Sequence, residues 1–169
     1  MGSIVGAIGA TVFVLTNRDA LPDPWPVIAL VAWGAVLALY LRMVLFASTE
    51  QLPPAGEPAP RALLVYGASV VGMIALIQLG RWVLSQQGRE ELEPAVIVIC
   101  VGLHLLPFAA AFRAPVFHTL GWVMTALGVL GLVIGWLTTG TAAAAAAVIT
   151  GVVMLVLIAL GTRDRLQPT

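Results

Sequence analysis

The chain has 169 residues, of which 60% are hydrophobic and only 9% are charged, and its formal net charge is zero. Soluble domains carry about 25% charged residues, so this composition excludes a water-soluble globule. A net charge of zero also predicts no general attraction to nucleic acid. Long apolar runs alternate with short polar breaks, which is the pattern of a helical protein that crosses a membrane several times.

We predict an all-α, polytopic transmembrane helical bundle that forms one domain over residues 1–169. The other structure able to span a membrane, a closed β-barrel, needs segments of about ten residues with alternating polarity, and the sequence has none. Six apolar segments predict six spans, or five if the short first segment does not cross. The predicted spans cover residues 2–16, 25–47, 61–84, 95–112, 116–137 and 141–161.

The first segment, residues 2–16, would form a helix of about 22 Å, which is shorter than a bilayer core of about 30 Å. A cleaved signal peptide is the competing interpretation. It would need positive residues before the apolar stretch and a cleavage site of small residues after it. The flanking Met-Gly-Ser and Thr-Asn-Arg-Asp sequences supply neither, so we expect a short helix that is retained.

Acidic residues are confined to the connections and the tail. Residues 48–60 contain four prolines and predict an extended, solvated loop. Residues 85–94 contain Arg89 and three glutamates and predict the most charged loop. Proton relays and cation sites within a bilayer usually depend on buried carboxylates. Carboxylate-driven antiport and buried-carboxylate catalysis are therefore disfavoured.

The arginines predict the orientation of the bundle. Six spans place both termini on one side together with five arginines, whereas the opposite side receives three. Because cytoplasmic loops carry the excess of positive residues, the termini should be cytoplasmic and residues 85–94 should face outside. If the first segment does not cross, only the N-terminus changes side. Frequent Arg, Ala and Gly without any Lys suggests a bacterial protein of the cytoplasmic (inner) membrane.

His104 is the leading candidate for a functional residue, because its ionisable side chain falls near the middle of a long apolar run. Ionisable residues at that depth are costly and are often functional, and an unperturbed imidazole titrates near physiological pH. Pro107 follows within one turn and is expected to kink the helix by removing a backbone donor. The alternative is a neutral histidine that only bonds to a backbone carbonyl.

Other polar and aromatic residues are candidates to complete a ligand pocket around His104. Gln78 and Arg81 fall on one face of the third segment, and Gln78 is the expected partner of the imidazole, directly or through a water. Snorkelling of Arg81 and an interhelical hydrogen bond of Gln78 are the simpler interpretation. Three aromatic candidates, which packing explains equally well, are Tyr66, Tyr40 and Trp33.

The sequence predicts no metal, cofactor or catalytic site. Cys100 lies one turn before His104, but two ligands are too few for a zinc site. His118 differs from His104 by about 9 Å in depth, which argues against a haem held by both. No phosphate-cradling loop or nucleophile elbow is present, so an enzyme is the less favoured interpretation.

The fifth segment carries a stripe of glycines at helical spacing, and small residues let membrane helices approach closely. The stripe is therefore interpreted as a surface for packing against a neighbouring helix. Its members are Gly121, Gly128, Gly131 and Gly135.

Residues 102–112 read Gly-Leu-His-Leu-Leu-Pro-Phe-Ala-Ala-Ala-Phe, followed by an Arg-Ala-Pro link and a glycine-rich segment. This arrangement resembles a pattern in small, uncharacterised polytopic bacterial membrane proteins. The resemblance implies a bacterial membrane protein and attaches no activity.

Two functions of different classes follow from these features. The first is a small integral membrane protein that binds or transports a small apolar or weakly polar ligand in an intramembrane pocket around His104. The alternative is a non-catalytic accessory or assembly subunit of a larger membrane complex, which would explain the short loops and the small-residue faces. The expected surroundings are the lipid bilayer and either a homo-oligomer or a larger complex.

Overall fold

The computed structural model describes residues 2–46 and 61–163. Within these ranges the chain forms six α-helices, two short 3-10 helices and no strand, which confirms the all-α bundle. The α-helices are α1 (Gly2–Asn17), α2 (Trp25–Phe46), α3 (Ala62–Gln86), α4 (Glu93–Ala111), α5 (Pro115–Leu137) and α6 (Thr141–Arg163). The 3-10 helices are η1 (Arg18–Ala20) and η3 (Glu90–Leu92). The extended loop predicted for residues 48–60 lies outside the described residues.

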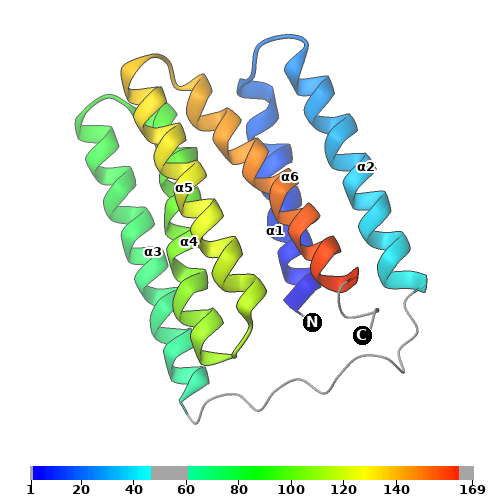
Figure 1. The fold of residues 1–169 in the computed structure, drawn as a ribbon. Coiled ribbons are helices and arrows are strands. Elements are labelled where there is room, and N and C mark those ends of the chain that lie inside the picture. Colours follow the sequence, from blue (N-terminus) through cyan, green and yellow to red (C-terminus); the bar gives the residue numbers. More distant parts are fainter. Residues whose placement is uncertain (1, 47–60, 164–169) are drawn as a thin grey trace.

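The helices have the length and composition of membrane spans. Five of them, α2 to α6, are long and apolar enough to cross a bilayer, so the chain is a multi-pass membrane protein. α1 has 16 residues and a length of about 24 Å. It begins at the end of the bundle where α6 finishes (Figure 1), as an even number of antiparallel helices requires.

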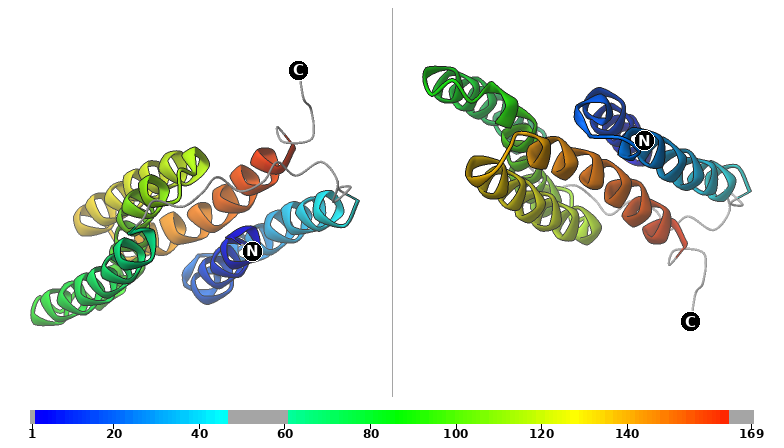
Figure 2. Two further views of the ribbon diagram at one scale, coloured as in Figure 1. Left: turned by 90° about the horizontal axis from the view of Figure 1, so that it is seen from below. Right: turned by 90° about the horizontal axis from the view of Figure 1, so that it is seen from above.

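α6 lies at the centre of the bundle and packs against α1, α5, α2 and α4. On one side of it, α4 and α5 form the most extensive helix pair, and α3 lies at the edge against α4. On the other side lie α1 and α2. The two further views show α3, α4 and α5 on one side of α6 and α1 and α2 on the other (Figure 2). α2 and α3 therefore occupy opposite edges.

Glycines mark the closest helix contacts. A Cβ atom on Gly128 would lie 2.7 Å from Cγ1 and 2.9 Å from the backbone nitrogen of Ile99 in α4. A Cβ atom on Gly121 would lie 2.8 Å from the Gly102 carbonyl oxygen. All four glycines of the α5 stripe are buried, and the stripe lies at the contacts that α5 makes with α4 and α6. Close approach of this kind is how small residues hold membrane helices together.

Helix ends differ from the predicted boundaries by one or two residues. α4 begins at Glu93, two residues earlier than predicted, because proline at the second position of a helix costs no hydrogen bond. Glu93, which we predicted to lie in the loop before the fourth span, is therefore the first residue of α4. Beyond the end of α3, Gly88 has a φ of 62°, and the Arg89 nitrogen donates to the Leu84 carbonyl oxygen in a Schellman motif.

Candidate functional site

His104 is part of an aromatic cluster between α3 and α4. Its ring centroid lies 5.9 Å from that of Tyr66 in α3. Phe108 and Phe112 follow His104 at one-turn spacing on the same face of α4, with centroids 5.8 and 6.4 Å from Tyr66. Tyr66 is 40% exposed. The cluster therefore lies at the edge of the bundle, where α3 meets the membrane.

The imidazole of His104 is partly buried, but its hydrogen bonding is incomplete among the described residues. His104 is half-buried, and its Nδ1 atom is buried without a hydrogen-bond partner among the described residues. Its polar neighbour on α3 is the backbone at Ser69. α4 continues as one helix through Pro107. The described contacts of His104 are thus aromatic and backbone contacts.

Gln78 and Arg81 do not approach His104. They lie about 18 and 22 Å beyond Tyr66 along α3, given the rise of a helix. Gln78 is exposed, and Arg81 forms an ion pair with Glu93, with Nε and Oε1 2.7 Å apart. This corrects the expectation that these residues and His104 line one polar cavity. The error lies in the depth assumed for Gln78, because His104 lies beside Tyr66, about three helical turns away from Gln78 along α3.

Tyr40 and Trp33 belong to the opposite side of the bundle. Both are on α2, and both contribute to the core formed with α1 and α6. The Trp33 Nε1 atom donates to Oγ1 of Thr11 in α1 at 3.2 Å. Tyr40 is 3% exposed, and its hydroxyl has no partner among the described residues. Among the three aromatic candidates, Tyr66 is the one in ring contact with His104 in the described part of the chain.

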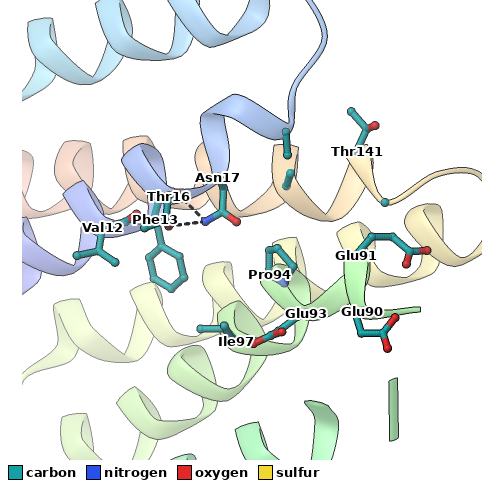
Figure 3. A pocket seen from close by; sticks show the side chains of 13 residues that line it. Val12, Phe13, Thr16, Asn17, Glu90, Glu91, Glu93, Pro94, Ile97 and Thr141 are labelled. Carbon is teal, nitrogen blue, oxygen red and sulfur yellow. Dashed lines mark hydrogen bonds between the residues drawn. The ribbon is translucent and has the colours of Figure 1, made fainter. Parts of the chain in front are cut away.

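A cavity of about 710 Å³ lies at the end of the bundle where α1 finishes and where α4 and α6 begin. Its wall is apolar and includes Phe13 of α1, Ile97 of α4 and Ala144 of α6. Figure 3 shows Phe13 extending from α1 toward Pro94 and Ile97 of α4. The cavity therefore sits between three helices that are far apart in the sequence.

Polar groups gather at the mouth of this cavity. Asn17 ends α1, and its Nδ2 atom donates to the Phe13 carbonyl oxygen at 2.9 Å. From the other side, η3 and the first turn of α4 contribute three carboxylates. Gly140 allows this arrangement, because a Cβ atom there would collide with the Glu91 side chain.

Two of the three carboxylates are already paired. Glu93 pairs with Arg81, and Glu91 accepts from Arg89 Nε at 2.7 Å. Glu90 is exposed and has no ion pair or hydrogen bond from its side chain among the described residues. The mouth therefore carries one uncompensated negative charge when all three are ionised.

Arg89 connects the mouth to the end of α5. Its Nη2 atom donates to the carbonyl oxygens of Gly135 and Trp136 at 2.9 and 3.2 Å, which are acceptors without partners inside the helix. Its guanidinium also lies 4.9 Å from the centre of the Trp136 ring. A cation at a helix C-terminus is electrostatically favourable. The acidic mouth is thus tied to the rest of the bundle through Arg89 and Glu91.

The cavity combines apolar side chains with carboxylates. Among the described residues, no group of three or more His, Cys, Asp or Glu side chains is arranged to hold a metal ion. Sequence reasoning noted the charges at residues 89–93 but assigned them to a loop. No sequence signal points to Phe13, Ile97 or Ala144, which are ordinary apolar residues brought together by helix packing.

The chain matches no family model, no curated protein and no solved structure.

Proposed function

We propose that this chain is a multi-pass protein of the bacterial cytoplasmic membrane that binds a small amphipathic ligand in the cavity between α1, α4 and α6. The observation that carries the proposal is the combination of an apolar wall and an acidic mouth in one hollow of about 710 Å³. Ligand pockets usually enclose about 300–1,000 Å³ and combine a mostly apolar lining with a few polar groups that set orientation.

The lining defines the chemistry of the ligand. An apolar body would pack against Phe13 and Ile97, and a polar end would reach Glu90. Ionised carboxylates only accept hydrogen bonds, so the polar end should be a cation or a hydrogen-bond donor. A negatively charged ligand would be repelled by the uncompensated charge at the mouth. This describes a weakly polar ligand with an amine, amide or hydroxyl group.

The arginine distribution supports an orientation for this site. The cavity is at the end of the bundle opposite to the start of α1 (Figure 1). With cytoplasmic termini, as the excess of arginines on their side suggests, the cavity opens to the outside. This position suits capture of a ligand before uptake, or its release after export.

Ligand binding is tested with the purified protein in phosphatidylcholine nanodiscs and a fluorescent amphipathic amine, dansylcadaverine, with the uncharged dansylamide as a comparison. Saturable binding of the amine is expected. Ala20→Phe, at an exposed position that lines the cavity, narrows it and should weaken binding about tenfold or more, which corresponds to about 1.4 kcal/mol. The same substitution at the exposed Ala75 on α3 is the matched control and should change nothing.

Two further variants test the role of the Glu90 charge and the location of the pocket. Glu90→Gln should weaken binding of the amine and leave that of dansylamide unchanged. His104→Leu should leave both unchanged, whereas a pocket centred on His104 would lose its ligand. Equal affinities for the parent protein and Ala20→Phe would exclude the α1–α4–α6 cavity as the binding site.

A non-catalytic accessory or assembly subunit is the second candidate function. It is favoured by α3, which is apolar around most of its surface and is held almost only by α4. Pull-down from membranes in a mild detergent tests it. Recovery of a different membrane protein in stoichiometric amount would support this function, and recovery of the chain alone would count against it.

A further inference from the structure

A second hollow lies between α2 and α6 and is apolar along almost its whole length. Its volume is about 490 Å³. Trp25, Ile28 and Ala32 of α2 form one wall, and the opposite wall follows α6 from Thr141 to Val153. Thr141 is the only polar side chain among the residues that line it, and it also borders the α1–α4–α6 cavity.

The groove exists because small side chains are interleaved with large ones. Ala29, Ala32 and Ala145 line it together with Ile28 and Ile149. The alanines leave space between the helices, and the branched residues border that space. Because α2 and α6 are both candidate spans, the groove opens toward the region that acyl chains occupy.

The length of the groove suits one acyl chain. Thr141 to Val153 covers about 18 Å of helix, which is close to half of a hydrocarbon core of about 30 Å. The groove is therefore about as long as one leaflet is deep.

We propose that the groove between α2 and α6 holds one acyl chain of a phospholipid from the leaflet in which α2 begins. Trp25 stands at the mouth, at the depth where interfacial aromatic side chains belong. Thr141 offers its hydroxyl at the same level, near the ester groups of the lipid. Lipid tails are as apolar as the groove itself, so shape and van der Waals packing, not removal of apolar surface from water, hold the chain.

The proposal does not depend on the ligand of the neighbouring cavity, and photolabelling tests it directly. The full chain is reconstituted in dioleoylphosphatidylcholine vesicles that contain a small fraction of phosphatidylcholine with a diazirine on one acyl chain. After irradiation, mass spectrometry locates the labelled residues. Labelling of the groove walls should be several-fold stronger than labelling of the exposed α3 residues Leu64 and Val71, which contact only exchanging lipid.

Substitutions in the α2 and α6 walls of the groove test whether the excess labelling comes from an acyl chain inside it. Ala32→Phe on α2 and Ala145→Phe on α6 should each remove the excess labelling of the groove. Ala38→Phe, at an exposed position on α2, should retain it. Labelling no stronger than at Leu64, or an excess that persists in both groove variants, would overturn the proposal.

Discussion

α6 and α3 are both long and strongly apolar, yet they occupy opposite positions in the bundle. In an apolar stretch of 18 residues from each helix, 61% of the stretch is buried inside the protein in α6 but only 6% in α3. α6 carries small buried residues such as Ala143, Ala147 and Gly151, whereas large exposed side chains such as Leu64 and Val71 cover α3. Since lipid tails are as apolar as leucine, close packing and not hydropathy decides which helix is central.

The largest expected effect comes from placing the same side chain on both helices. A Cβ atom on Gly151 would lie 2.6 Å from the Ala10 carbonyl oxygen and 2.7 Å from Cγ2 of Val14. Gly151→Leu must therefore push α1 away and should cost about 3 kcal/mol. Thermal unfolding in detergent micelles measures the loss.

Gly72→Leu on α3 is the matched control, because nothing lies within 4 Å of its Cβ position. It should change the free energy of unfolding by less than about 0.5 kcal/mol. Similar losses in both variants would contradict the difference between α6 and α3.

The second prediction extends the comparison to α5. Gly128→Leu would collide with the Ile99 backbone and with the Ala95 carbonyl oxygen, 3.0 Å from the Cβ position, and should cost about 2 kcal/mol. Leu130→Ile, at a 56% exposed position, should have little effect. A small, equal response to both substitutions would mean that the glycine stripe faces lipid.

The third prediction concerns the contact between α3 and α4. His104→Leu removes a buried nitrogen that has no partner among the described residues and should raise the free energy of unfolding by about 1 kcal/mol. Tyr66→Phe keeps the aromatic contact and should be nearly neutral. A marked loss of stability in His104→Leu would show that the imidazole makes a structural hydrogen bond, for example through a water.

The smallest expected effect comes from the ion pair between Arg81 of α3 and Glu93 of α4. Arg81 is 52% exposed at its side chain, so Arg81→Ala should cost about 0.5 kcal/mol at low salt and less at high salt. Gln78→Ala, on the same exposed part of α3, should show no salt dependence. An Arg81→Ala loss that is large and insensitive to salt would mean that α3 depends on this pair more than its exposure indicates.

The positions of the helices follow from sequence because apolar runs and polar breaks reveal where a chain can cross a bilayer. Glu93 was misplaced because a glutamate before Pro94 resembles a loop residue, although it is the first residue of α4. Gln78 is paired with His104 by depth from the outer helix ends, whereas the structure places Tyr66 beside His104. α3 is apolar around most of its circumference. Periodicity then does not show which face of α3 meets α4, and a cavity made by three distant helices leaves no local signal.

The short length of α1 has a consequence for the surrounding bilayer. α1 covers about 24 Å and α3, with 25 residues, about 37 Å. A bilayer adjusts to a short hydrophobic segment by thinning locally, at a cost of fractions of a kcal/mol per Å of mismatch. The membrane surface should therefore dip beside the end of α1, next to Asn17 and the acidic mouth. Acyl-chain length then becomes a variable that controls how far water reaches into the cavity, and thicker membranes should close access to it.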